Sequence, residues 1–297
     1  MQEQLRVGLR CLESASALLR RIRSMHPTAG SLEAADLQWW WRSPRSTDNI
    51  PQLFWFDGQG RPEAAVIATD WGDEVALDVI VMPDASPDEV AHVVERGLAH
   101  AAACGFEAVS VVIDAADDVM RAVLAGHGFA IDHDASPLSI VTAWLAADAR
   151  PSIRPLREDH RLLRRLDTMD RPHHMIRRSG PNVEARLRQT PLYRADLDLL
   201  ILEAHDGVAA YALFWFDPET ATGLVEPMRT EDEHQRRGLA RHLLAAGIQR
   251  LTEAGAARIK LCFSPGNPAA RDLYLGVGFV PEKQTVVLTG RAGAQTT

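Results

Sequence analysis

Apolar and polar residues follow two regular spacings in the C-terminal half of the chain, and these spacings predict alternating strands and helices. Apolar residues alternate with other residues over 259–263, which predicts a strand with one buried face. Between 240 and 251 they recur at helical spacing, which predicts an amphipathic helix that begins near Arg237. Two apolar segments flank Asp206-Gly207, a strong two-residue turn signal, and therefore predict a hairpin. By the same interpretation we expect, in chain order, a strand over 152–156, a helix around 161–166, an irregular or helical stretch over 168–189, hairpin strands at 199–204 and 208–216, and a strand at 223–229.

The first half repeats this pattern when the chain is laid on itself at a shift of 150 residues. Phe279 then falls on Phe129 and Gly278 on Gly128, and the expected strand at 259–263 falls on 109–113. The simplest account is two copies of one αβ unit joined near 146–151. We expect the following division and elements: a first domain at 1–148, a second at 149–297, a strand meander at 53–57, 63–69 and 74–82, and equivalent helices at 91–104 and 241–254.

The segment Gln235 to Ala240 is the most informative motif, because it opens the helix that begins near Arg237. The first N–H groups of a helix lack internal partners, and the helix dipole adds partial positive charge there. Gly238 removes a side chain where a phosphate would approach the backbone, and Arg236 adds positive charge. The alternative is an ordinary loop glycine followed by a surface helix.

A second motif follows at Asn267 to Tyr274. Asn267 is a good helix N-cap and Pro268 suits the first helical position, so a short helix is expected that ends near Gly276. This helix carries Ala270 and Tyr274 on one side. The alternative for Tyr274 is an aromatic side chain that packs with its hydroxyl in water.

Together the two motifs resemble the acetyl-CoA site of the GNAT N-acetyltransferase superfamily. The resemblance implies an α/β (α+β) fold in which each copy is a mixed, mostly antiparallel sheet with helices on both faces, splayed where the fourth and fifth strands part. It implies that the hydroxyl of Tyr274 protonates the leaving thiolate, which is reasonable for a thiol pKa of about 8.5 and a phenol pKa of about 10. It also implies these acetyl-CoA contacts: Met228 and Thr230 along the pantetheine arm, and Gln235, Arg236, Arg237, Gly238, Leu239, Ala240, Asn267 and Ala270 around the two helix starts.

Attack on a thioester needs a neutral amine, so the reaction needs a base. Glu226 is the first candidate, because many GNAT enzymes use a strand glutamate in this region. The alternatives are that Glu226 binds the ammonium group of a substrate or only hydrogen-bonds the adjacent loop.

The two copies differ where the chemistry would lie. Leu124 falls on Tyr274, and the acidic segment 82–89 with two prolines stands where the glycine turn would be expected. Such a segment would repel a pyrophosphate, and Asp84 or Ser86 is better explained as a helix cap. We therefore expect a degenerate N-terminal copy without acetyl-CoA chemistry, as in the tandem arrangement of some bacterial GNAT proteins.

Two clusters remain outside these motifs. His173-His174 lies in the region that selects substrate in this superfamily, as a substrate-lining pair or a solvated loop, and no other residues are obviously spaced to complete a metal site. We therefore expect no metal. Three indoles in succession, at 39–41, cannot all face one core, so at least one is expected to meet another domain, a subunit or a ligand.

Composition fits a cytoplasmic protein with two packed domains. The 297 residues are 46% hydrophobic, with no run long enough to span a membrane and no resemblance to a signal peptide at the start. Three widely spaced cysteines suggest neither disulfides nor a metal cluster. The net charge of −8 argues against a general nucleic-acid binder and weakly favours a cationic amine substrate.

The sequence thus predicts an acetyl-CoA-dependent N-acetyltransferase, with its active site in the C-terminal copy, that acts by direct attack of a primary amine of a small molecule or peptide. The alternative is a catalytically silent CoA-binding sensor or partner module. The acceptor, the length of the acyl chain, the oligomeric state (a homodimer included) and the role of the N-terminal copy stay open.

Overall fold

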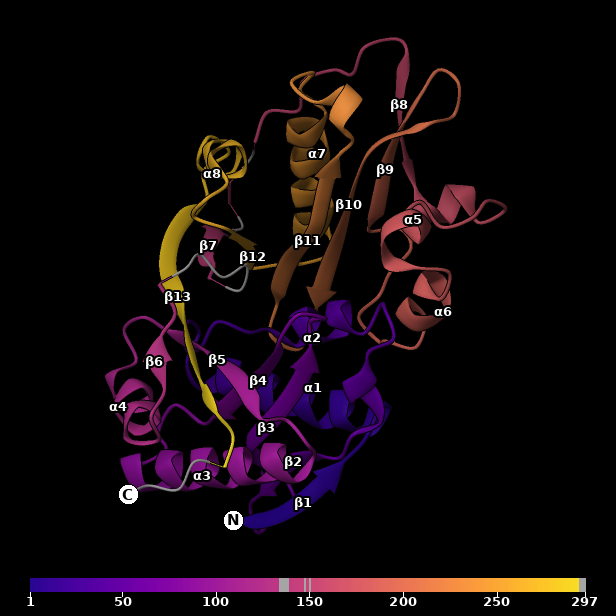
Figure 1. The fold of residues 1–297 in the computed structure, drawn as a ribbon. Coiled ribbons are helices and arrows are strands. Elements are labelled where there is room, and N and C mark those ends of the chain that lie inside the picture. Colours follow the sequence, from indigo (N-terminus) through magenta and orange to yellow (C-terminus); the bar gives the residue numbers. More distant parts are fainter. Residues whose placement is uncertain (134–138, 147, 150, 294–297) are drawn as a thin grey trace.

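The structure is a computed structural model that describes residues 1–133, 139–146, 148–149 and 151–293. Its first half contains the strand meander and helices that the sequence predicts (Figure 1). Ser86 caps the helix at 87–103, as expected, because its side chain and that of Glu89 cap each other's backbone N–H groups. The elements of the first half are β1 (Gln2–Arg6), α1 (Leu9–Met25), α2 (Ala34–Trp40), η1 (Ser46–Asn49), β2 (Gln52–Phe56), β3 (Pro62–Asp70), β4 (Val75–Val81), α3 (Pro87–Ala103), β5 (Ala108–Asp114), α4 (Asp118–Gly126), β6 (Ala130–Ile131) and β7 (Val141–Ala146).

The second half confirms the predicted hairpin and both predicted helices near the motifs. Asp206 adopts a positive φ of 66° in the turn between the hairpin strands. Asn267 caps the second motif helix, as expected, because its Oδ1 accepts the N–H of Ala270 at 3.1 Å. The elements of the second half are β8 (His160–Arg164), η2 (Arg165–Thr168), α5 (Ile176–Ser179), α6 (Val183–Leu187), β9 (Asp198–Glu203), β10 (Val208–Asp217), β11 (Thr222–Thr230), η3 (Asp232–His234), α7 (Leu239–Glu253), β12 (Arg258–Phe263), α8 (Pro268–Leu275) and β13 (Val280–Arg291).

Two expectations about the start of the second half are wrong. Residues 152–156 form no strand, and the first strand of this half is β8 (His160–Arg164) in place of the predicted helix around 161–166. β8 pairs antiparallel with β9, from His160 with Glu203 to Arg164 with Leu199. The partner strand, distant in sequence, therefore overrides the local pattern.

All the described strands join in one sheet, in the order β1-β2-β3-β4-β5-β13-β7-β12-β11-β10-β9-β8, with β6 paired to β13. Most neighbours are antiparallel, whereas β4 with β5 and β11 with β12 are parallel. The halves exchange their last strands: β7 pairs with β12 of the second half, and β13 continues from β7 to β5 of the first half. In Figure 1, β13 runs as one long yellow strand from the upper half to the lower half.

Helices cover both faces of each part of the sheet. Apolar residues of α7, such as Leu243 and Ile248, pack against Phe214 and Leu261 on one face of the second half. α3 and α4 cover the corresponding face of the first half, and α1 covers its other face.

Helix α2 lies between the two halves (Figure 1). Its Leu37 packs with α1 and the first-half sheet, whereas Trp39 packs with Trp215 and Leu213 of the second half. The first half therefore supplies part of the layer that covers the second-half sheet, so residues of α2 reach the face on which Glu226 lies.

Candidate functional site

The turn before α7 presents free backbone donors. Gly238 adopts a φ of 83°, a conformation that favours glycine, and no atom lies within 4 Å of the position that a Cβ would occupy. Within the part of the chain that the structure describes, the N–H groups from Arg236 to Ala240 have no hydrogen-bond acceptor. Arg236 and Arg237 are exposed, and Gln235 donates to Asp232 Oδ1 at 3.0 Å. The turn can therefore bind an anion through its N–H groups.

The corresponding helix of the first half begins differently. The side chains of Ser86 and Glu89 take up the backbone donors at the start of α3, with Ser86 N–H donating to Glu89 Oε2 at 2.8 Å. The carboxylate of Glu89 thus lies where an anion would otherwise bind. This start of a helix is closed to phosphate by its own capping box.

The two motifs of the second half are adjacent in space. The guanidinium of Arg241, in the first turn of α7, donates to the carbonyl oxygen of Gly276 at the end of α8, at 2.9 Å. Leu239 is buried beneath the turn, and Ala240 and Ala270 are partly buried. The structure therefore brings the glycine turn and the helix of Tyr274 together, as the resemblance implied.

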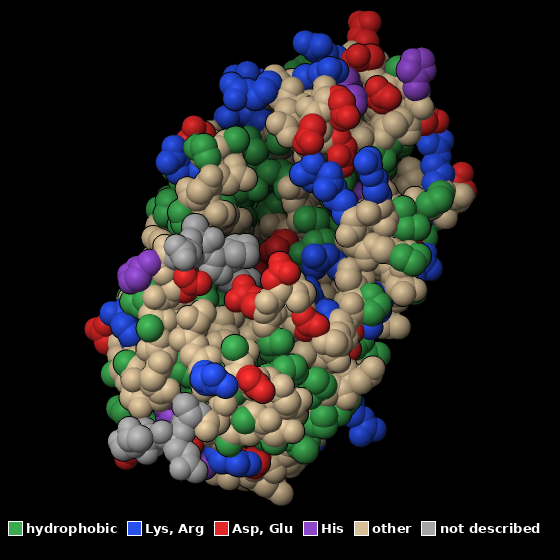
Figure 2. All heavy atoms as spheres, viewed as in Figure 1, with side chains coloured by type: hydrophobic (Ala, Val, Ile, Leu, Met, Phe, Trp, Pro, Cys, Tyr) green, Lys and Arg blue, Asp and Glu red, His purple; other side chains and the backbone are tan. Residues whose placement is uncertain are grey.

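The strands β11 and β12 part beside these motifs. Their pairing runs from Thr222 with Arg258 to Val225 with Leu261, and β11 then continues to Thr230 without a partner on that side among the described residues. Met228 and Thr230, predicted to follow the pantetheine arm, lie on this open stretch and are partly buried. In Figure 2 the surface is hollowed between α8 and β11.

Glu226 is the first residue of β11 beyond the parting. Two residues there, Glu226 and Pro227, face the single Leu213 of β10, and the Glu226–Pro227 peptide bond is cis. The indole N–H of Trp215 donates to the carbonyl oxygen of Glu226 at 2.7 Å, which fixes the backbone at this bulge.

The Glu226 carboxyl group is half-buried, and its pKa is raised to about 7. Burial is the main cause, and the charge of Asp36 adds to it, whereas Lys260, Arg42 and a hydrogen bond with the Trp39 side chain oppose it. A carboxyl with a pKa near neutrality can accept a proton and release it again near pH 7.

Tyr274 lies on the opposite wall of the parting. Its side chain is 8% exposed and packs between Phe263 and Phe279, with ring centroids 5.9 and 6.3 Å away. The pKa of the phenol is raised to about 12, mainly by burial and in smaller part by the nearby charges of Glu226 and Cys262. The hydroxyl therefore stays protonated and can donate a hydrogen bond.

An ion pair that the sequence did not indicate lies beside Glu226. Lys260 of β12 is 1% exposed, and its Nζ lies 2.5 Å from Asp36 Oδ2 of α2 and also donates to the carbonyl oxygen of Ser31. The one signal in the sequence was a lysine at an alternating position of an otherwise apolar strand. Its partner is 224 residues away, so local spacing could not identify it.

These residues border a cavity of about 480 Å³ between the halves. Glu226, Lys260 and Cys262 line it from the second half, and residues of α2, β4, β5 and α4 line it from the first. A cavity of this volume is within the range of small-molecule sites.

His173 and His174 acquire a buried partner that the sequence did not reveal. Both Nε2 atoms lie near the carboxylate of Asp198, at 3.1 and 3.0 Å, and the hydroxyl of Tyr193 donates to Asp198 at 3.0 Å. Burial alone would raise the pKa of Asp198, but the two histidines hold it far below its ordinary value.

One potential ligand atom from each of His173, His174 and Asp198 lies within 4.8 Å of the other two, so these residues could hold a metal ion. The N–H of Met175, however, donates to His173 Nδ1 at 3.2 Å, so His173 Nε2 carries the proton and donates it to Asp198. A protonated Nε2 has no free lone pair for a metal, so this arrangement favours a hydrogen-bonded network that fastens the loop to β9.

The three consecutive tryptophans take different positions, and two of them meet the other half, as expected. Trp39 joins the core of the second half, and the indole N–H of Trp41 donates to Gln189 Oε1 at 2.8 Å. Arg186 stacks on the Trp41 ring, with Cζ 3.7 Å from the centroid. Trp40 instead packs edge-on against Trp71 of the first half.

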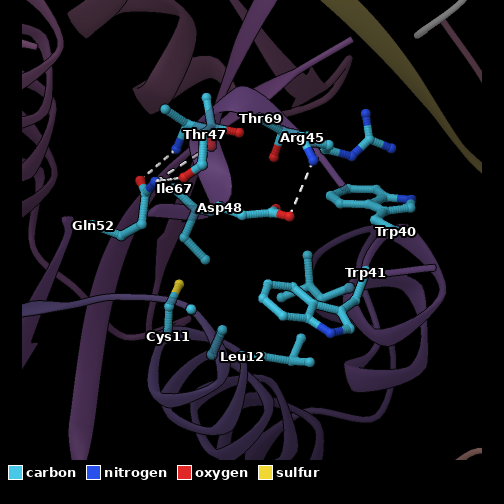
Figure 3. A pocket seen from close by; sticks show the side chains of 14 residues that line it. Cys11, Leu12, Trp40, Trp41, Arg45, Thr47, Asp48, Gln52, Ile67 and Thr69 are labelled. Carbon is cyan, nitrogen blue, oxygen red and sulfur yellow. Dashed lines mark hydrogen bonds between the residues drawn. The ribbon is translucent and has the colours of Figure 1, made fainter. Parts of the chain in front are cut away.

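A second cavity, of about 70 Å³, is lined by residues of the first half that include Trp40 and Trp41 (Figure 3). Two of its polar side chains already have partners: Asp48 accepts the N–H of Arg45 at 3.0 Å, and Gln52 donates to the carbonyl oxygen of Thr47.

Among the described residues, no helix is long and apolar enough to cross a membrane.

Comparisons with known proteins agree with this fold. Residues 163–279 match the acetyltransferase (GNAT) family, whereas no curated protein matches the chain. The fold is similar to that of a tandem GNAT protein from the clavulanic acid biosynthesis pathway, with a TM-score of 0.72, 12% identity and 99% of each chain covered. It is also similar to a GCN5-related N-acetyltransferase from Sphaerobacter thermophilus, with a TM-score of 0.60, 15% identity and coverage of 98% of this chain and 95% of that one. A third similar structure is a GCN5-related N-acetyltransferase from Kribbella flavida, with a TM-score of 0.55, 18% identity and coverage of 94% and 97%.

Proposed function

We propose that this chain, whose residues 163–279 belong to the acetyltransferase (GNAT) family, moves the acetyl group of acetyl-CoA to a primary amine of a small molecule or peptide. The observation that carries the proposal is the parting of β11 and β12, with Glu226 at the branch and Tyr274 on the opposite wall. The free N–H groups from Arg236 to Ala240 lie at the neighbouring helix start.

The glycine turn would bind the pyrophosphate of acetyl-CoA. Free N–H groups at a helix start attract phosphate, and Arg236 and Arg237 add charge for ion pairs. The pantetheine arm would follow the open edge of β11 at Met228 and Thr230, with Asn267 and Ala270 on the other side. This orientation directs the thioester toward Glu226 and Tyr274.

The reaction then needs two proton transfers. The amine nitrogen attacks the thioester carbonyl carbon, a C–N bond forms, and the C–S bond breaks to release the thiolate. Glu226 takes the proton that the amine loses, and the Tyr274 hydroxyl donates a hydrogen bond and then its proton to the sulfur. Water then returns a proton to the phenolate and accepts the proton held by Glu226, so both groups regain their starting state. The raised pKa of Glu226 suits a base near pH 7, and the raised pKa of Tyr274 keeps the phenol in its donor form.

The first half, for which we propose the boundaries 1–148, does not carry this chemistry. The capping box of Ser86 and Glu89 occupies the start of α3, and Leu124 stands on α4 where α8 has Tyr274. Both observations support a copy that has lost its acetyl-CoA site. The second half, 149–297, keeps both features.

Acetyl-CoA titration by calorimetry tests the cofactor half of the proposal. Gly238→Glu should abolish binding, because it places a carboxylate at the phosphate turn. Gly60→Glu is the matched control, since Gly60 is also exposed, has a φ of 76° and has no neighbouring atom within 4 Å of its Cβ position. It should bind like the wild type. A wild type that does not bind acetyl-CoA would overturn the proposed function.

A further inference from the structure

The two halves place a carboxylate at the same point of the fold. In the second half the last parallel pair is Val225 with Leu261, and the next residue of β11 is Glu226. In the first half the last parallel pair is Leu77 with Val111, and the next residue of β4 is Asp78. Asp78 is therefore the structural counterpart of Glu226, in a half that has lost the phosphate turn.

Asp78 is buried and weakly engaged. Its side chain belongs to a residue that is 7% exposed, and its hydrogen bond is a long one of 3.4 Å from the hydroxyl of Thr69. Burial raises the pKa of Asp78 to about 7. A buried carboxyl without a strong donor is costly, and a ligand that supplied one would relieve that cost.

Asp78 and Glu226 face one cavity. Both line the cavity of about 480 Å³ between the halves, together with apolar residues that include Val79, Ile80 and Met120. The gap where β4 and β5 of the first half part therefore belongs to the same cavity as the Glu226 carboxyl group of the second half.

The other acidic residues of this cavity already have partners. Asp36 is paired with Lys260 at 2.5 Å, and Asp114 with Lys283 at 2.9 Å. Asp117 accepts the N–H of Met120 as a helix cap. Among the described residues, neither Asp78 nor Glu226 has an ion-pair partner within 4.0 Å.

We propose that this cavity binds the acceptor, and that Asp78 holds a second cationic or hydrogen-bond-donating group of an acceptor whose reacting amine lies at Glu226. The inference rests on the proposed function for the role of Glu226. The apolar residues that line the cavity together with the two carboxylates fit an apolar middle section, so the substrate class is an amine with two polar ends and an apolar body. Asp78 is then a specificity-determining residue, and the first half serves as the acceptor-binding half.

The probes are 1,8-diaminooctane and n-octylamine, which differ only in the second amine. CoA release from acetyl-CoA should show that the wild type prefers the diamine in kcat/KM by about tenfold or more, the value of one charge-assisted hydrogen bond. Asp78→Asn should remove the preference by raising KM for the diamine about tenfold, with kcat and the monoamine values unchanged. Asp73→Asn, in an exposed loop of the same half, is the matched control and should behave like the wild type.

Two results would overturn the inference: a wild type without preference for the diamine, or an Asp78→Asn variant that lowers the rates with both amines equally. Acetyl-CoA titration of Asp78→Asn separates this failure from that of the proposed function, because this variant should bind acetyl-CoA like the wild type. If neither amine is acetylated, calorimetry of 1,8-diaminooctane with the free protein decides. Binding that Asp78→Asn weakens about tenfold supports the site, and no binding by the wild type refutes it.

Discussion

Lys260 of β12 and Asp36 of α2 form a buried ion pair between the two halves, with Nζ 2.5 Å from Oδ2 and both side chains at most 4% exposed. The pair borders the same cavity as Glu226, whose pKa the Asp36 charge raises and the Lys260 charge lowers. The first half thus contributes to the electrostatics of the candidate catalytic carboxyl group.

Loss of either partner of this pair should destabilise the protein strongly. Lys260→Met or Asp36→Asn should each lower the free energy of unfolding by about 3–5 kcal/mol, because each leaves the charge of the other residue buried without its partner. The double variant should lose much less unfolding free energy than the two single variants lose together. Denaturant unfolding of the wild type, both single variants and the double variant measures this double-mutant cycle. Arg61→Met removes the exposed pair of Arg61 with Asp57 and should cost at most about 1 kcal/mol. Additive losses at Lys260 and Asp36 would contradict the pairing.

Activity should rise with pH through about 7. Glu226 must be deprotonated to act as the base, and its pKa is raised to about 7. We expect kcat/KM to climb to a plateau above this pH, and Glu226→Gln to abolish the rise and lower kcat roughly 10²–10⁴-fold. A pH profile that Glu226→Gln leaves unchanged in shape would assign the base to another group.

The raised pKa of Glu226 also predicts how the stability of the protein depends on pH. Its pKa in the folded state lies above the ordinary value of 4.5, so the folded state binds its proton more tightly than the unfolded state. Its contribution to stability is therefore present at low pH and is lost as pH rises from about 4.5 to about 7. We expect the unfolding free energy of Glu226→Gln, relative to that of the wild type, to be higher at pH 8 than at pH 5 in denaturant unfolding. The same difference between variant and wild type at both pH values would refute this prediction.

Tyr274→Phe should separate catalysis from folding. The Tyr274 hydroxyl has no hydrogen-bond partner among the described residues, so its removal should change the free energy of unfolding by less than about 1 kcal/mol. If the hydroxyl protonates the thiolate, kcat should fall roughly 10²-fold with acetyl-CoA affinity unchanged. Tyr193→Phe is the contrasting control, because it removes a hydrogen bond to buried Asp198 and should cost about 1–3 kcal/mol. An unchanged kcat in Tyr274→Phe would remove the tyrosine from the mechanism.

The halves should fold only together. Fragment 1–148 has β7 without its partner β12, and fragment 149–297 has the end of β13 without β5. Each fragment alone would expose unpaired strand edges and apolar surface, so we expect aggregation or loss of structure by circular dichroism. Co-expression should give a one-to-one complex by size-exclusion chromatography, and two independently folded monomers would contradict the strand exchange.

Local sequence determined the elements that close over a few residues. The hairpin at Asp206-Gly207, the cap of α8 at Asn267 and the left-handed turn at Gly238 each depend on neighbours within about four positions, so spacing and residue type were sufficient. The two motifs that carry Tyr274 and the free N–H groups could be identified from the sequence for the same reason.

Tertiary structure decided what depends on partners distant in the chain. It turned the expected helix at 161–166 into β8 by pairing it with β9, and exchanged β7 and β13 between the halves. It also paired Asp36 with Lys260, brought Asp198 next to the two histidines, and placed Asp78 and Glu226 in the lining of one cavity. A sequence records the spacing of neighbours, whereas burial and charge pairing depend on which surfaces meet after folding, so these contacts could be seen only in the assembled sheet.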